Sequence, residues 1–468
     1  MSRRNVDLGS GSVGKLLFSL AVPTITSQIV NMLYNIVDRI YIGHIPGSGS
    51  LALTGVGVCL PIIMVVSAFA ALVGSGGAPR ASIFMGKDDM DSAEKILSGC
   101  FTVQIIISAI LTAVLLLFGR SMLLTFGASE NTIGYAVDYM SIYAVGTIFV
   151  QMTLGMNMFI TAQGFSKTSM LTVTIGAVCN IILDPLFIFG LGMGVKGAAL
   201  ATIISQAVSC GWVLAFLTGK KTFLRIKKEY LKPVPSIVFP CLALGLSTFV
   251  MQSSESVISV CFNSSLLKYG GDLAVGAMTI LTSTMQFAML PLQGVAQGAQ
   301  PILSYNFGAK NADRVKKTFF RLLTVSLCYS VALWAFVMLV PKTFAGIFSP
   351  NPELVNFTGD ALRIYCGALF LFGIQIACQM TFVSIGNAGC SIIVAVLRKF
   401  VLLIPLIYIM PQLLADKTNA VYTAEPAADA IAVTCTAILF SIEFRKALKK
   451  LNSDSAGGTQ PAKTDLRV

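Results

Sequence analysis

Apolar runs long enough to cross a lipid bilayer follow one another along almost the whole sequence. A transmembrane helix needs about 20 mainly apolar residues in succession. Only 12% of the 468 residues are charged, about half the share found in a typical soluble domain, so the runs are rarely interrupted. Twelve suitable runs lie at residues 15–43, 51–79, 96–119, 134–161, 168–190, 195–217, 235–263, 273–303, 319–340, 354–384, 388–411 and 427–443. The sequence therefore predicts an all-α polytopic membrane protein with twelve transmembrane helices.

Basic residues are concentrated in every second connection between the predicted helices. The two ends of the chain and the even-numbered loops hold most of the 33 Lys and Arg residues. The odd-numbered loops hold only Arg120, Lys196, Lys268, Lys342 and Lys417. Because basic loops face the cytoplasm, we expect both termini inside the cell and the protein in the cell membrane. The net charge of +12 is then mainly an orientation signal, and its dispersal over short loops argues against nucleic-acid binding.

The residue types that usually build metal centres or catalytic sites are scattered. The eleven cysteines stand singly in or beside apolar runs, without CxxC spacing, and the one histidine, His44, lies in a predicted loop. We therefore expect no enzyme activity and no cofactor. The one metal ion that the sequence leaves open is Na⁺, as a coupling ion held by intramembrane acids.

The second half of the chain repeats the first at an offset of 222 residues. This shift aligns PRASIFMGKDDMDSAEK at 79 with PILSYNFGAKNADRVKK at 301, and VDYMSIY at 137 with GDALRIY at 359. We predict a duplicated six-helix unit with an N-lobe at 1–218, a cytoplasmic linker at 219–234, a C-lobe at 235–446 and a disordered cytoplasmic tail at 447–468. Because six is an even number, the lobes are predicted to be pseudo-symmetric parallel repeats. Transporters built from such repeats work by alternating access.

Few ionisable residues lie inside the predicted spans. Placing one there costs about 2.5 to 3.5 kcal/mol on insertion scales, so each is a functional candidate. They are Asp38, Asp184, Glu255, Arg398 and Lys399, with Asp429 near the start of the last span.

Asp38 and Asp184 are predicted to lie at the same depth in the outer half of the N-lobe. With a rise of about 1.5 Å per residue, they lie about 7 Å and about 9 Å from the outer ends of their helices, and Thr202 lies about 10 Å deep. Asn180 shares a helical face with Asp184. Two carboxylates close together in a low dielectric cannot both ionise cheaply, so this group is predicted to hold a proton or to share Na⁺. The C-lobe lacks the site, because the equivalent residues are Val260, Leu402 and Leu406.

Each of these residues has a structural alternative. Asp184 could serve an interhelical hydrogen bond, and Asp38, next to Arg39, could be a solvated carboxylate near the membrane surface. Glu255 could bind substrate or ion, or could only line a polar surface. Arg398 is predicted to lie about 15 Å into its helix. It needs a partner there, most simply Glu255 or backbone carbonyl groups.

The substrate cavity is predicted to lie between the two lobes. Met285 and Phe287 carry the soft thioether and the aromatic ring that suit varied greasy cations, although packing in the core or against lipid is the commoner fate of such side chains. The other predicted lining residues are Glu255, Gln252, Gln28 and Tyr34.

Four segments resemble the multidrug and toxic compound extrusion (MATE) family. They are LAVPTITSQIVNMLYNIVDRIYIG at 20, PRASIFMGKDDMDSAEK at 79, MNMFITAQGFSKTSM at 156 and CNIILDPLFIFGLGMGVKGAALATIISQ at 179. The resemblance implies a twelve-helix, two-lobe antiporter that expels organic cations and drugs, driven by inward H⁺ or Na⁺. It also implies a bend of the first helix at Pro23 and a coupling-ion network of Asp38, Asn180, Asp184 and Thr202, with Asn157 nearby.

One departure from the family concerns the tenth helix. Some branches carry an acid there that works with the seventh-helix Glu, but the stretch LFLFGIQIACQM at 369 has none. This favours a coupling site in the N-lobe.

A lipid-linked sugar or polysaccharide flippase is the main alternative function. It would need a large cationic cavity, for which only Arg398 and Lys399 qualify. We expect small cationic or amphipathic substrates, the lipid bilayer as the surroundings and a monomer as the working unit.

Overall fold

The computed structural model describes residues 8–348 and 351–456, which form helices joined by short connections. The first half contains α1 (Val13–Gly43), α2 (Gly49–Gly86), α3 (Met90–Thr125), α4 (Ile133–Ala162), α5 (Ser166–Pro185) and α6 (Val195–Thr218). The second half contains α7 (Pro235–Gly308), α8 (Ala312–Leu339), α9 (Pro341–Phe348), α10 (Pro352–Tyr365), α11 (Phe372–Ser384), α12 (Ala388–Val396), α13 (Ile404–Leu413) and α14 (Lys417–Ala456). Two π-helical segments, Leu186–Gly190 and Leu397–Leu403, extend α5 and join α12 to α13.

The prediction of twelve spans is confirmed. Ten helical stretches of the described chain are long and apolar enough to cross a membrane, and α10 with α11 forms an eleventh span that is bent by 46°. The 74 residues of α7 would reach about 110 Å, several times the thickness of a bilayer core. Gly271, with φ 63° and ψ −161°, breaks this helix, so α7 supplies two of the twelve spans.

The predicted internal repeat is visible in where the elements begin. The first residues of α1, α3, α5 and α6 are Val13, Met90, Ser166 and Val195. At the offset of 222, their equivalents are Pro235, Ala312, Ala388 and Lys417, which begin α7, α8, α12 and α14. Each half is therefore a copy of the same six-span unit.

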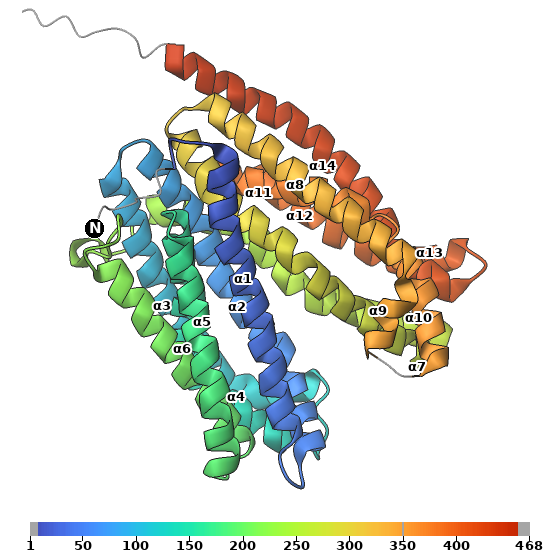
Figure 1. Ribbon diagram of the computed structural model, residues 1–468. Helices are drawn as coiled ribbons and strands as arrows, with labels where there is room; N and C mark the ends of the chain where they lie inside the picture. The colour runs from blue at the N-terminus through green and yellow to red at the C-terminus, as the bar shows by residue number, and fades with distance from the viewer. Residues whose placement is uncertain (1–7, 349–350, 457–468) are drawn as a thin grey trace, which may run out of the picture.

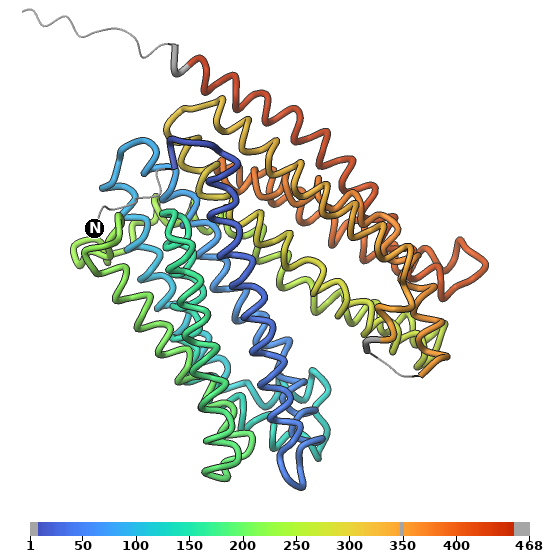
Figure 2. The backbone as a smooth tube through the Cα atoms, viewed as in Figure 1, coloured from blue at the N-terminus to red at the C-terminus, as the bar shows by residue number. Residues whose placement is uncertain are grey.

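The two lobes meet at one end and diverge at the other (Figures 1 and 2). Helices α1 to α6 form the N-lobe, in blue to green, and α7 to α14 form the C-lobe, in yellow to red. The connections 87–89 and 309–311 lie at the end where the lobes meet, whereas the loop after α1 and the loop before α14 lie at the diverging ends.

Two glycines related by the repeat allow the lobes to meet closely. A Cβ atom on Gly86 would lie 1.9 Å from the carbonyl oxygen of Tyr305, and one on Gly308 would lie 1.9 Å from that of Ile83. The offset of 222 relates Gly86 to Gly308 and Ile83 to Tyr305, so this crossing of α2 and α7 has local two-fold symmetry. Small residues let membrane helices approach at such points.

The segments that precede α1 and α7 are each held by the opposite lobe. The guanidinium group of Arg314 on α8 donates to the carbonyl oxygens of Gly11 and Ser10, at 2.8 Å and 3.0 Å. In the linker, the Thr222 hydroxyl and the N–H groups of Phe223 and Leu224 donate to Gln163 Oε1, at 2.8 to 2.9 Å. These contacts attach each lobe to the start of the other.

The last helix is longer at both ends than the predicted span. It begins at Lys417, where Asp416 caps it by accepting from the Asn419 N–H at 3.0 Å. Glu425 and Asp429, which lower the hydropathy of this stretch, are buried in ion pairs with Arg398. It continues to Ala456, so residues 447–456 of the predicted disordered tail are helical. This stretch is rich in Ala, Leu and Lys, which favour a helix. The rest of the predicted tail lies outside the described residues.

Candidate functional site

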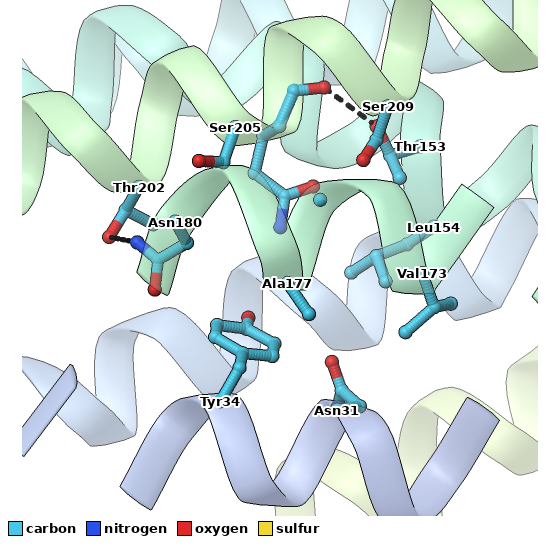
Figure 3. A pocket seen from close by; sticks show the side chains of 12 residues that line it. Asn31, Tyr34, Thr153, Leu154, Val173, Ala177, Asn180, Thr202, Ser205 and Ser209 are labelled. Carbon is cyan, nitrogen blue, oxygen red and sulfur yellow. Dashed lines mark hydrogen bonds between the residues drawn. The ribbon is translucent and has the colours of Figure 1, made fainter. Parts of the chain in front are cut away.

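Helices α1, α4, α5 and α6 surround a small cavity in the N-lobe (Figure 3). Its volume of about 30 Å³ is large enough to hold a water molecule. Tyr34 and Asn31 of α1 point toward α5 across this space. The lining residues are Asn31, Tyr34, Thr153, Leu154, Val173, Gly176, Ala177, Asn180, Thr202, Ser205, Gln206 and Ser209.

The structure brings together Asp38, Asn180, Asp184 and Thr202. The Asp38 side chain interacts directly with the Asp184 side chain, and both residues are buried, with exposed fractions of 9% and 0%. Asn180 Nδ2 lies 3.3 Å from Asp184 Oδ1, to which it donates, and 3.5 Å from Thr202 Oγ1. Two buried carboxylates in contact need a proton or a cation between them, because two bare negative charges would repel strongly in a low dielectric.

This group and its neighbours on α6 contain buried oxygen atoms without a hydrogen-bond partner. Within the described part of the chain, no hydrogen-bond partner is present for the atoms Asp38 Oδ1, Asp184 Oδ2, Asn180 Oδ1, Ser205 Oγ and Gln206 Oε1. Leaving a buried polar atom unpaired costs about 1 to 3 kcal/mol. Carboxylate, amide and hydroxyl oxygens are suitable ligands for a hard cation. The donor set therefore fits H⁺ or Na⁺.

Several polar residues of this site were not predicted from the sequence. Tyr139 is buried on α4 and its hydroxyl contacts Thr202. On α6, Ser205, Gln206 and Ser209 continue the face that begins with Thr202. Their spacing of three, four and seven residues from Thr202 is a helical stripe, and this signal was available in the sequence. Tyr139 gave no such signal, because an aromatic residue in an apolar run is usually core.

Two residues implied by the family resemblance, Asn157 and Pro23, do not line the cavity. Asn157 on α4 does not line the cavity, and its Nδ2 donates to the carbonyl oxygen of Ser169 at 3.3 Å. Pro23 is buried within α1. Next to it, Thr24 donates to the carbonyl oxygen of Gly294 at 2.6 Å, so this part of α1 packs against the C-lobe.

The predicted substrate-lining residues are distributed over both lobes. Gln28 Nε2 donates to Gln297 Oε1 at 3.2 Å across the lobe junction, whereas Tyr34 lines the N-lobe cavity. Met285 packs beside Cys366 in the C-lobe, with their sulfur atoms 3.7 Å apart. Of the predicted lining residues, Gln252, Glu255 and Phe287 are exposed on α7. The described contacts do not join this set into one closed pocket.

The predicted partner of Arg398 was wrong. Arg398 pairs with Glu425 at 3.0 Å and with Asp429 at 2.6 Å, and its guanidinium carbon lies 4.7 Å from the centre of the Phe372 ring. Glu255 instead pairs with Lys399, at 2.7 Å. Arg398 and Lys399 are adjacent in the π-helical segment Leu397–Leu403, and their side chains reach acids on two different helices, α14 and α7. Glu425 was missed because the last span was predicted to start after it.

Comparison with known proteins identifies the family. The MatE family model matches residues 23–186 and again residues 247–409, once in each lobe. The chain belongs to the MatE family. It is therefore a multi-pass membrane transporter and not an enzyme.

One similar relative is the multidrug export protein MepA of Staphylococcus haemolyticus, which is 26% identical over 440 residues covering 94% of this chain and 96% of the relative. A crystal structure of MATE in the bent conformation matches with a TM-score of 0.90 at 23% identity, covering 97% of this chain and all of the other. MATE in the straight conformation matches with a TM-score of 0.87 at 24% identity, covering 96% and 100%. These structural matches show that the fold is shared.

Proposed function

We propose that this protein is a secondary antiporter that exports organic cations and drugs in exchange for H⁺ or Na⁺. The observation that carries the proposal is the contact between the buried carboxylates of Asp38 and Asp184, surrounded by unpaired oxygen atoms. The export of drugs is supported by the similarity to MepA, a multidrug export protein.

The coupling ion acts on the packing of the N-lobe. When the Asp38 and Asp184 group takes up a positive ion, the repulsion between the two carboxylates disappears and α1 can pack more closely against α5. Because α1 carries Asp38 beyond Pro23, we propose that it bends at this proline as the ion enters. Similar MATE structures exist in a bent and a straight conformation. The movement narrows the space between the lobes and releases the substrate, and a bias of a few kcal/mol between the two states is sufficient.

The orientation in the membrane follows from the charge of the connections. The connections 87–89 and 309–311 and the linker belong to the basic set that faces the cytoplasm. We therefore place both termini in the cytoplasm. We also propose that the protein lies in the plasma membrane and works as a monomer. The lobes then diverge toward the outside, which corresponds to an outward-facing state.

A lipid-linked sugar flippase receives no specific support. Such a protein would need a large basic surface between its lobes to bind the phosphate groups of its substrate. In the described C-lobe, Arg398 is enclosed by two acids and Lys399 is paired with a third. These two cations are outnumbered by three acids, so the group does not form a basic surface for a diphosphate-linked oligosaccharide.

The direct test is ethidium export by purified protein in lipid vesicles. A pH gradient and a Na⁺ gradient are applied separately, each directed so that the ion enters the compartment from which export is measured. We expect export under one of the two gradients and none in vesicles without a gradient. The effective gradient identifies the coupling ion. Export that is independent of both gradients would contradict antiport.

A further inference from the structure

A polar stripe runs along one face of the first half of α7. The exposed polar residues of this stripe are Gln252, Glu255, Ser259 and Asn263. Their spacing of three to four residues places them on one side of the helix, whereas exposed Val257 and Val260 lie on another side. Because polar side chains are costly in lipid, this side of α7 is suited to face water and not lipid.

Glu255 on this stripe holds a lysine that is otherwise enclosed by protein. The Lys399 side chain is only 6% exposed, and its ammonium group lies 2.7 Å from Glu255 Oε1. The Glu255 side chain is 56% exposed and can leave this position without opening the core. Arg398 differs, because both of its acidic partners have side chains that are at most 11% exposed. Of the two buried cations, Lys399 is therefore the one whose acidic partner is exposed to water.

Packing of the fold does not require a charge at Lys399. The internal repeat relates Arg398 and Lys399 to Gly176 and Ala177 in the N-lobe, and these two small residues line the N-lobe cavity. The equivalent position of the N-lobe is therefore occupied by a residue without a charge. A buried lysine costs free energy unless it is paired, so its presence in the C-lobe calls for a role other than stability.

We propose that Glu255 and Lys399 form a binding site for zwitterions, that is, for amphipathic molecules with one cationic group and one carboxylate. Without substrate, the two side chains neutralise each other. A zwitterion replaces this single ion pair by two, with its cationic group on Glu255 and its carboxylate on Lys399. The inference rests on the proposed function and names a substrate class for it.

The same exchange disfavours simple cations. A substrate with only a positive charge draws Glu255 away from Lys399 and leaves a buried ammonium group without a partner. Truncating one side of a buried charge pair is costly for the same reason. A zwitterion conserves the number of ion pairs and avoids this cost. The site therefore prefers a zwitterion to a cation of the same size and shape.

Two dyes that differ in one ester group test this preference. A rhodamine with a free benzoate is a zwitterion, and its methyl ester is a cation of nearly the same shape. Export of each dye is measured in vesicles under the gradient that drives ethidium export. For the wild-type protein, we expect the KM of the zwitterion to be at least about tenfold lower than that of the ester, the lower end of the effects measured for close charge pairs.

Lys399→Met is the decisive variant. It removes the partner of the substrate's carboxylate, so the zwitterion loses its advantage, while the ester no longer leaves a buried lysine unpaired and its KM should fall toward that of the zwitterion. The preference should disappear. Lys268→Met, which removes an exposed lysine from α7 near the end of the span that carries Glu255, should leave the preference unchanged. Equal changes for both dyes in Lys399→Met would overturn the inference.

Glu255→Gln gives a second signature that does not depend on Lys399→Met being folded. Neither dye then has an acidic partner, and neither has to break the pair between Glu255 and Lys399, but only the zwitterion still pairs with Lys399, so the preference for it should persist. Loss of the preference would contradict the inference. If the wild-type protein exports ethidium but treats the two dyes alike, the zwitterion site is wrong and antiport stands. If no cation is exported under either gradient, the proposed function itself has failed.

Discussion

Asp184→Asn should abolish ion-driven drug export while leaving the protein folded. The asparagine fills the same volume but cannot gain or lose a charge, so the ion gradient can no longer bias the two packings of the N-lobe. We expect gradient-driven ethidium export to fall at least about tenfold, which corresponds to about 1.4 kcal/mol of lost coupling. The measurement is initial export from vesicles that contain equal amounts of folded protein. Asp38→Asn should behave in the same way.

Two further variants separate coupling from a general effect of removing an acid. Asp138→Asn removes a half-exposed carboxylate on α4 that pairs with Lys196 at 3.5 Å, and export should remain at the wild-type level. The double variant Asp38→Asn with Asp184→Asn should be no worse than either single variant, because residues that act as one unit are not additive. Undiminished export by either single variant would remove the coupling role from this pair.

Asp429→Asn should produce the largest loss of stability among single polar substitutions in the C-lobe. It leaves the Arg398 guanidinium buried with Glu425 as its one remaining acidic partner. Breaking a buried ion pair from one side costs about 3 to 5 kcal/mol. We expect a clear decrease in the thermal unfolding midpoint of the protein in detergent. Neutralising the whole group with Arg398→Met, Glu425→Gln and Asp429→Asn should restore much of the loss.

An exposed ion pair provides the control for this experiment. Glu443 accepts from Lys446 at 2.8 Å near the end of α14, where both side chains reach the solvent. Surface pairs of this kind contribute little, so Glu443→Gln should melt with the wild-type protein. If Asp429→Asn also melted at the wild-type temperature, the ion pairs of Arg398 with α14 would not be stabilising the C-lobe.

The helices and their repeat were readable from the sequence because the membrane imposes a simple pattern. Long apolar runs must be helices in lipid, and Pro, Gly and charged residues at one offset revealed the duplication. The boundaries of α14 were not readable by the same rule. Glu425 and Asp429 make its first turns resemble a loop, and only their pairing with Arg398 in three dimensions explains their burial.

The contacts of the candidate site that follow from the depth of a residue in the membrane were predicted. The contacts that depend on the direction of a side chain were missed. Asp38 and Asp184 share a depth on neighbouring helices, so their contact follows from helix length and topology. Tyr139 contacts Thr202 only because α4 is rotated to face α6. The choice of Arg398 or Lys399 as the partner of Glu255 depends likewise on the rotation of one helix, which hydropathy does not report.

The most direct test of the central claim is electrical measurement on protein vesicles attached to a solid-supported membrane. A rapid increase of H⁺ or of Na⁺ is applied in the absence of drug, so that the current reports ion binding alone. The account predicts a transient current for the coupling ion in the wild-type protein, and no current in the Asp38→Asn and Asp184→Asn variants. Currents of wild-type size in both variants would contradict the claim that these two buried acids bind the ion that drives transport.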